Sequence, residues 1–270
     1  MQTSCQRIIS LSPSTTEILF ALGLGDRVVG VTRYCTYPPE ARKKATVGGY
    51  LDPNYEAIVM LKPDVVILLP EHQNAAAFLD ELGIQHFTID NKAIADILSA
   101  IRLVGETCGA REKAQKLLAD IDRMMNSIQE QTKSLPRPRV MICIGRPLNT
   151  GALEEVYIAG RGTSYDELIV AAGGSNAFSD KKPAYPMLSA EGIINVNPDI
   201  IIDLIADMEQ KGLTESVALK EWQSVAGVNA VKNNRLYALS QSYSFVPGPR
   251  FIYLLRDLAH IIHPEIEWND

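Results

Sequence analysis

The sequence has no long apolar run and no excess of positive charge, and both absences narrow the possible classes of protein. No run of apolar residues reaches the roughly 18–20 residues that a membrane helix requires. Of the 270 residues, 26 are Lys or Arg and 32 are Asp or Glu, so the net charge is −6. A surface that binds nucleic acid would need a basic face. We therefore expect a globular protein without a nucleic-acid partner.

The sequence also lacks the short motifs of common catalytic and cofactor sites. It has no G-x-S-x-G nucleophile turn and no H-E-x-x-H motif, and its G-x-G triplets at Gly23 and Gly160 lack the third glycine of a dinucleotide fingerprint. No two cysteines have C-x-x-C spacing, so free thiols or one disulfide both stay open. The four cysteines are Cys5, Cys35, Cys108 and Cys143. We expect neither an enzyme nor a resident cofactor or metal.

Only four histidines are present, and they are dispersed. His260 and His263 lie close together near the end of the chain, where we expect solvated side chains. His86 is expected at a strand edge. His72 follows an apolar strand predicted over 65–69. Open α/β sheets bind ligands beyond the carboxyl ends of their strands, so His72 is a candidate pocket residue.

One stretch of the sequence occurs twice, at residues 50–69 and 185–204. An offset of 135 residues superposes four pairs of identical residues and the apolar strand after each Pro-Asp. The pairs are Tyr50 and Tyr185, Glu56 and Glu191, Pro63 and Pro198, and Asp64 and Asp199. A repeat of about half the chain length predicts two similar lobes that face one another.

Strand and helix patterns alternate along the first half, which predicts an α/β fold with a parallel sheet between helices. Apolar residues three and four apart then predict one long helix over about 110–133. The second half repeats the theme, with a loop over 145–162. The predicted domains are an N-terminal lobe (1–108), a bridging helix (109–136) and a C-terminal lobe (137–270). The spacing of Ser14 and Glu17 predicts a capping box.

Aromatic residues gather in the loops that follow strands or precede the repeated helices. They are Tyr34, Tyr50, Tyr185, Tyr243 and Phe245. Each could pack over the edge of its own lobe, but two lobes that present the same Tyr would offer flat surfaces to a flat ligand. Four arginines in or beside these loops could neutralise carboxylates or phosphates of a ligand, or be solvated. They are Arg33, Arg146, Arg161 and Arg250.

Glu56 and Glu191 begin equivalent predicted helices. An acidic residue stabilises a helix N-terminus by about 0.3–1 kcal/mol, and that alone would explain the repetition. The alternative is that one Glu from each lobe docks on a basic site of a two-fold partner.

Together these segments resemble the substrate-binding proteins of ABC importers for metal chelates, most closely the periplasmic cobalamin-binding proteins. The resemblance runs from about Arg7 to Ala259. It is carried by residues 10–23, 29–41, 47–68 and 185–202 and by the Pro249-Arg250 start of the last helix. It implies two Rossmann-like lobes joined by a single long backbone helix, with a ligand cleft between the lobes.

The resemblance also implies roles for individual residues. Tyr34, Tyr50 and Tyr185, with the segment Ser242–Tyr243, match ligand-pocket positions of the cobalamin binders, although those proteins carry Trp at both Tyr50 and Tyr185 and Asp at Ser242. Arg33 and His72 complete the expected ligand-binding set. Glu56 and Glu191 match glutamates that dock on arginines of the permease dimer.

We therefore predict a non-enzymatic receptor that captures a corrinoid and delivers it to an ABC permease. Haem binders use Tyr to ligate iron, so haem or a ferric siderophore is the alternative ligand, and an α/β metalloenzyme is a distant one. The expected protein is a monomer. It is expected to be periplasmic or extracellular and membrane-associated, with a signal segment absent from this sequence.

Overall fold

The computed structural model describes residues 5–180, 182–208 and 210–268, which form two compact units. Unit 1 comprises residues 1–123 together with Val246–Arg250, and unit 2 comprises 124–245 together with 251–270. The long helix α5 (Arg111–Thr132) begins in unit 1 and ends in unit 2. Near its C-terminal end the chain returns to unit 1 through the segment Val246–Arg250. The lobe boundaries expected from the sequence stay a prediction.

Unit 1 contains a five-stranded sheet in which every strand pair is parallel, and the alternating pattern predicted this parallel pairing. The strand order is β3-β2-β1-β4-β5. The strands are β1 (Ile8–Ser10), β2 (Val28–Val31), β3 (Ala45–Thr46), β4 (Val65–Leu68) and β5 (His86–Thr88). The helices are α1 (Pro13–Ala21), α2 (Tyr55–Met60), α3 (Gln73–Glu81) and α4 (Ile94–Thr107), with 3₁₀ turns η1 (Gly25–Arg27) and η2 (Pro39–Lys43).

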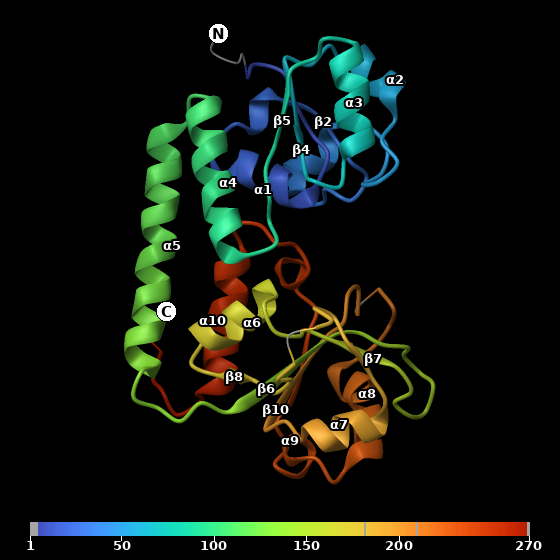
Figure 1. Cartoon of the computed structure of the whole chain (residues 1–270), viewed down its shortest axis with the longest axis vertical. Coiled ribbons are helices and arrows are strands. Elements are labelled where there is room, and N and C mark those ends of the chain that lie inside the picture. Colours follow the sequence, from blue (N-terminus) through green and yellow to red (C-terminus); the bar gives the residue numbers. More distant parts are fainter. Residues whose placement is uncertain (1–4, 181, 209, 269–270) are drawn as a thin grey trace. The chain divides into compact units, whose positions relative to one another are not determined.

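Helices cover both faces of this sheet (Figure 1). Ile9 and Leu68 point toward α2 and α3, where Ile58 and Leu79 are fully buried. The alternate strand residues face α1 and α4. Central strands buried on both faces must be apolar throughout, which is why β4 reads VVIL.

Helix α1 begins differently from the capping box expected at Ser14 and Glu17. Ser12 is the N-cap, and its hydroxyl accepts a hydrogen bond from the Thr15 amide at 3.1 Å. Glu17 is instead buried and forms an ion pair with Arg250, 233 residues away in the sequence. Arg250 Nε donates to Glu17 Oε2 at 3.0 Å and Nη2 to Oε1 at 2.6 Å. Spacing alone could not reveal a partner from the other end of the chain.

Unit 2 contains a mixed sheet rather than a second fully parallel one. The main order is β11-β10-β6-β7-β9, with β8 also paired to β6, and the β6–β7 and β7–β9 pairs are antiparallel. The strands are β6 (Arg139–Gly145), β7 (Val156–Ile158), β8 (Ser175–Asn176), β9 (Met187–Leu188), β10 (Ile200–Leu204) and β11 (Leu236–Leu239). The segment expected as a loop over 145–162 therefore contains β7.

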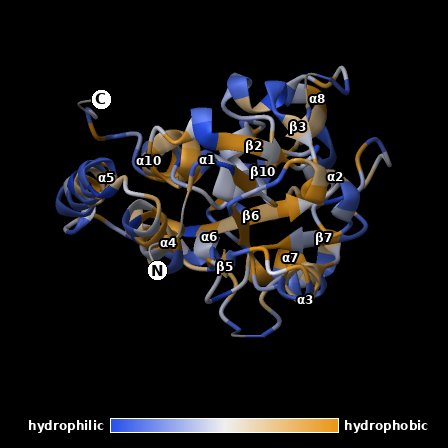
Figure 2. Ribbon diagram, turned by 90° about the horizontal axis from the view of Figure 1, so that it is seen from above, coloured by the Kyte–Doolittle hydropathy of each residue, from blue (hydrophilic) through white to orange (hydrophobic). Residues whose placement is uncertain are grey.

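Helices also lie on both sides of the second sheet (Figure 1). They are α6 (Ser164–Ala171), α7 (Ala190–Val196), α8 (Glu215–Leu219), α9 (Asn229–Lys232) and α10 (Phe251–Ile262), with 3₁₀ turns η3 (Lys220–Val225) and η4 (Ser242–Ser244). Trp222 of η3 is fully buried among residues of β6, β7 and β10. Figure 2 shows hydrophobic colouring along β6 and mostly hydrophilic colouring on α5. The buried residues of α5 are few and regularly spaced, as its sequence pattern predicts.

The repeated Pro-Asp has the same structural role in both units. Asp64 Oδ2 accepts from the Arg7 amide at 2.9 Å, and Asp199 Oδ2 accepts from the Arg139 amide at 3.0 Å. Each carboxylate thereby fixes the start of the first strand of its unit. The residue before each proline has a positive φ, 45° at Lys62 and 44° at Asn197. This left-handed residue ends the preceding helix and turns the chain into the strand.

Cys5 and Cys108 form a disulfide with a Cα–Cα distance of 5.1 Å, whereas Cys35 and Cys143 are free and buried.

His263 was expected to be solvated but is buried, and its Nδ1 lies 3.0 Å from Glu265 Oε1. Within the described ranges, no helix is both long and apolar enough to cross a membrane.

Candidate functional site

In unit 1, the loops that carry the predicted ligand residues emerge where parallel strands end. Tyr34 follows β2, and its side chain is 53% exposed. Arg33 lies beside it, with its guanidinium carbon 5.3 Å from the centre of the Tyr34 ring. Arg33 also forms an exposed ion pair with Asp52 at 2.8 Å. Such surface pairs contribute little to stability, about 0–1 kcal/mol.

Tyr50, Glu71 and His72 form a compact group at the same edge of the sheet. Tyr50 lies in the loop between β3 and α2, and Glu71 and His72 lie in the loop between β4 and α3. The Tyr50 hydroxyl donates to Glu71 Oε1, and the Tyr50 ring meets the His72 ring edge-on with centroids 5.1 Å apart. Burial raises the pKa of Tyr50, and the Glu71 carboxylate raises it further. The phenol is therefore neutral at physiological pH.

His72 is buried and holds the turn into α3. Its Nδ1 accepts a hydrogen bond from the Leu69 amide at 3.0 Å. Its Nε2 is also buried. Burial lowers the pKa of His72 against the opposing effect of Glu71, so the ring is neutral.

In unit 2, the predicted residues belong to two neighbouring clusters linked through Tyr165. Tyr185 is 48% exposed and precedes β9, and burial of its other part raises its pKa. Tyr165 of α6 lies near it, and burial followed by the effect of Tyr185 raises the Tyr165 pKa. The Tyr165 hydroxyl donates to the carbonyl of Ser244 at 2.7 Å, which ties α6 to η4. Sequence reasoning missed Tyr165 because it lies inside a helical pattern rather than a loop.

Ser242 and Tyr243 open η4. Ser242 is exposed, and Tyr243 is half-buried with its hydroxyl donating to Asp257 Oδ2 of α10 at 2.6 Å. The Tyr243 ring also packs edge-on against Tyr253 at 5.8 Å. Tyr243 is thus oriented by α10, while Ser242 stays accessible.

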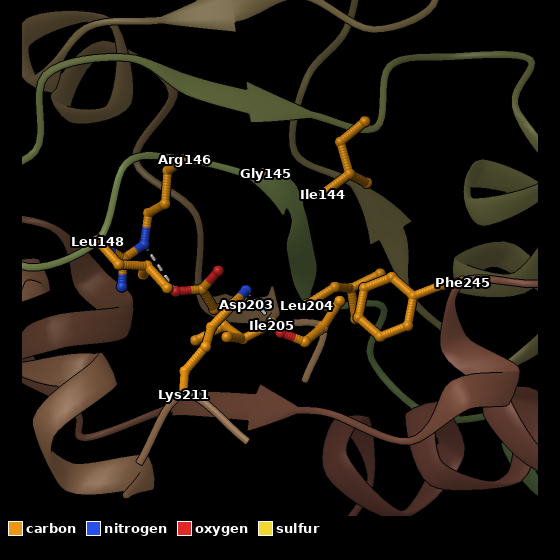
Figure 3. Close-up of a pocket in the computed structure, with 10 residues that line it drawn as sticks. Ile144, Gly145, Arg146, Leu148, Asp203, Leu204, Ile205, Lys211 and Phe245 are labelled. Carbon is orange, nitrogen blue, oxygen red and sulfur yellow. Dashed lines mark hydrogen bonds and ion pairs between the residues drawn. The ribbon is translucent and has the colours of Figure 1, made fainter. Parts of the chain in front are cut away.

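A pocket of about 210 Å³ lies at the carboxyl ends of β6 and β10 in unit 2. Its lining residues are Ile144, Gly145, Arg146, Leu148, Asp203, Leu204, Ile205, Ala206, Lys211 and Phe245. In Figure 3, Arg146 and Phe245 lie on opposite sides of it. Phe245 directly follows η4, so the pocket adjoins the Ser242–Tyr243 segment in the chain.

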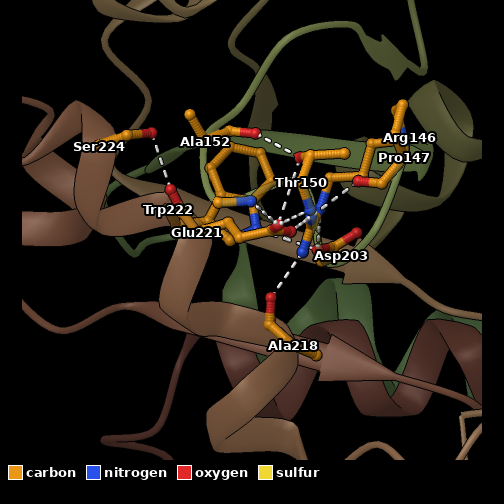
Figure 4. Close-up of polar contacts among 10 residues, drawn as sticks. Arg146, Pro147, Thr150, Ala152, Asp203, Ala218, Glu221, Trp222 and Ser224 are labelled. Atoms are coloured by element: carbon orange, nitrogen blue, oxygen red, sulfur yellow. Dashed lines mark hydrogen bonds and ion pairs between the residues drawn. The ribbon is translucent and has the colours of Figure 1, made fainter.

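Two of these lining residues, Arg146 and Asp203, belong to a buried ionic network (Figure 4). Arg146 Nε donates to Asp203 Oδ2 at 2.8 Å, Nη1 donates to Glu221, and Nη2 donates to the Ala218 carbonyl at 2.6 Å. The Trp222 indole donates to the same Asp203 oxygen at 2.9 Å. Two carboxylates therefore balance one guanidinium, and Arg146 has no uncompensated charge to offer a ligand anion.

Glu221 also fixes the loop between β6 and β7. The amides of Thr150 and Gly151 donate to its Oε1 at 2.7 and 3.0 Å. Burial opposes ionisation, but Arg146 and these amides lower the pKa of Glu221 overall. The network thus positions a loop of the pocket.

Glu56 and Glu191 occupy the same place in equivalent helices, each exposed in the first turn. The helices also share their caps, because the side chains of Asn54 and Ser189 accept from the amides of Ala57 and Gly192. The repeat therefore places one exposed glutamate at the start of a capped helix in each unit.

The four arginines expected near a ligand all lie close to carboxylates of the chain itself. The partners are Asp52 for Arg33, Asp203 and Glu221 for Arg146, Asp166 for Arg161 and Glu17 for Arg250. Among the described residues, no group of three or more His, Cys, Asp and Glu side chains could hold a metal ion.

Comparison with known proteins agrees with this geometry. The family described as periplasmic binding protein matches residues 8–243. The chain is 31% identical over 268 residues to an ABC transporter substrate-binding lipoprotein, YvrC, of Bacillus subtilis (strain 168), covering 96% of this chain and 81% of that protein.

Two solved structures are similar over nearly their whole length. The periplasmic vitamin B12-binding protein BtuF of Vibrio cholerae superposes with a TM-score of 0.78 at 27% identity, covering 97% of this chain and 98% of that one. The periplasmic haem-binding protein RhuT of Roseiflexus sp. RS-1 gives 0.80 at 28% identity, covering 97% and 99%. The chain therefore belongs to the periplasmic binding protein family, as a substrate-binding protein of an ABC transporter and not an enzyme.

Proposed function

We propose that this protein captures a corrinoid, a cobalamin-like metal chelate, and delivers it to the permease of an ABC importer. The observation that carries the proposal is the pair of repeat-related tyrosines, Tyr50 and Tyr185, each in a loop of its unit that precedes a repeated helix. A tyrosine ring offers a flat apolar surface together with a hydroxyl, and such a surface suits a flat macrocyclic ligand.

The remaining predicted residues extend these surfaces. Tyr34 and Tyr185 are about half exposed, which leaves ring area for a ligand to cover. Exposed Ser242 would meet the amide groups at the edge of a corrinoid. The vitamin B12-binding relative supports this ligand class.

Haem is the second candidate, and a specific observation favours it. A similar structure is named for haem binding, and Tyr is an established axial ligand of haem iron. Whether the protein binds a corrinoid or haem depends on whether a tyrosine of the site can ligate the metal ion.

We propose that the protein acts outside the cytoplasm. The Cys5–Cys108 disulfide supports this location, because structural disulfides persist in oxidising compartments. The lipoprotein relative supports attachment to a membrane surface. Exposed Glu56 and Glu191 would dock a monomeric receptor on two basic sites of the permease dimer.

The proposal is tested by titrating the protein with cyanocobalamin, dicyanocobinamide, ferric haem and ferric siderophores, with binding followed by absorbance. We expect a corrinoid to bind with a Kd below about 10 μM. Weaker binding by every chelate would contradict the proposed function. If only a ferric siderophore bound, the role in an ABC importer would stand, but the ligand would be a siderophore and not a corrinoid.

A further inference from the structure

The contacts around Tyr50 bear on the chemistry of the ligand, and the inference drawn from them rests on the proposed function. An iron or cobalt centre with an open axial position takes a lone pair from the protein, as haem iron does from His or Tyr. A chelate whose metal ion is fully coordinated needs only surfaces and hydrogen bonds. The protonation states of Tyr50 and His72 therefore distinguish the two classes.

His72 has no lone pair to offer. In neutral imidazole, one ring nitrogen carries the proton and the other accepts. Nδ1 accepts from the Leu69 amide at 3.0 Å, so the proton must lie on Nε2. Ligation through Nδ1 would break the turn between β4 and α3, and ligation through Nε2 would need the opposite tautomer. The buried Nε2 would also have to become exposed.

Tyr50 is also held in the form that does not ligate. A phenol oxygen binds a metal as phenolate, but here the hydroxyl donates to the Glu71 carboxylate. Loss of its proton would place two negative oxygens in hydrogen-bond contact, which like-charge repulsion disfavours. The edge-on His72 ring fixes the Tyr50 ring from the side. Arg33, which was expected in the same ligand-binding set, is engaged with Asp52.

We propose that Glu71 and His72 hold Tyr50 as a fixed, neutral phenol that packs against the ligand without ligating its metal, so that this site takes a chelate whose metal coordination is already complete. Corrinoids with both axial positions filled and ferric siderophores belong to this class, whereas haem does not. Glu71 and His72 are then positioning residues, and Tyr50 is a contact surface.

The first experiment asks whether the protein supplies an axial ligand. Dicyanocobinamide and diaquacobinamide differ in whether their axial ligands can be displaced. We expect them to bind with affinities within about threefold of each other, and the spectrum of the aqua form to stay unchanged on binding. Ferric haem should show neither tyrosinate-to-iron charge transfer nor a histidine-ligated spectrum.

The second experiment tests the positioning roles with matched variants. His72→Asn keeps an acceptor for the Leu69 amide but removes the ring beside Tyr50, and should weaken cyanocobalamin binding about tenfold. His86→Asn makes the same change at a position paired with Asp80 outside this group and should leave affinity unchanged. Glu71→Gln keeps an acceptor without its charge, so ultraviolet titration should show a lower Tyr50 pKa.

The outcomes separate this inference from the proposed function. A tyrosinate–iron band that disappears in Tyr50→Phe would overturn the role given to Tyr50. A band that persists in that variant would show another tyrosine ligating and would overturn the claim of complete coordination. Either result would leave an importer of haem. If no chelate binds, the proposed function fails and the inference falls with it.

Discussion

The buried ion pair between Glu17 and Arg250 allows the effect of its removal to be worked out from the structure. The side chains are 2% and 10% exposed, and two hydrogen bonds join them. The Arg250 guanidinium also lies 3.6 Å from the centre of the Tyr37 ring. Arg250→Met would keep much of the aliphatic stem and remove only the charged group.

The expected loss is large because a carboxylate would stay buried without its partner. Removing one member of a buried pair typically costs about 3–5 kcal/mol. The lost cation–π contact adds about 1 kcal/mol. The double variant Glu17→Gln with Arg250→Met leaves no buried charge, and we expect it to lose only about 1–3 kcal/mol.

The loss of stability caused by Arg250→Met should also depend on pH, and the protonation of Glu17 sets the direction of this dependence. Burial raises the pKa of Glu17 in the folded protein, against the opposing effect of Arg250. Between the unfolded and folded pKa values the folded state binds more protons, so stability falls as pH rises through that window. Removing Arg250 takes away the effect that lowers the pKa of Glu17, so the pH range over which stability falls extends to higher pH. The destabilisation by Arg250→Met should therefore be larger at about pH 8 than at about pH 5.

Urea unfolding at both pH values measures these effects. Far-UV circular dichroism follows both units, whereas tryptophan fluorescence follows unit 2, which contains both tryptophans. We expect the circular dichroism transition of unit 1 to shift. A loss below about 1 kcal/mol, a loss independent of pH, or a larger loss in the double variant would refute the reasoning.

Two further predictions concern the disulfide and the exposed glutamates. Replacing Cys5 and Cys108 by Ser opens a link across 103 residues and should lower the free energy of unfolding by about 4 kcal/mol, as measured by urea unfolding against the oxidised protein. An unchanged midpoint would show that the link constrains little. Glu56→Ala with Glu191→Ala should leave chelate affinity intact and weaken binding to the reconstituted permease. If the double variant lost chelate binding but still bound the permease, the two glutamates would be ligand residues and not docking residues.

The repeated pattern predicted much of the fold because its parts act locally. The helix, the left-handed residue and the Pro-Asp turn need only their neighbours, so Asp64 and Asp199 fix their strands in the same way. The short β7 and β9 escaped prediction because two or three residues show no usable period. Their antiparallel pairing depends on where the chain returns, which single-sequence patterns do not encode.

The candidate residues could be named from the sequence, but their contacts could not. Tyr50 was predicted from its place before a repeated helix and His72 from its place after a strand, yet nothing in the sequence joins Tyr50 to Glu71, 21 residues away. Arg250 likewise resembles a ligand residue until its partner Glu17 is seen. Paired charges are set by the fold, so sequence alone overestimates how many arginines are free for a ligand.

Because Val246–Arg250 belongs to unit 1, that unit cannot be obtained by cutting the chain once. A fragment ending at Arg123 would retain Glu17 in an apolar setting without its guanidinium. We expect such a fragment to be expressed poorly, whereas a fusion that restores the missing five residues through a short linker should fold. Designs that exchange units between relatives must therefore carry three crossover points instead of one.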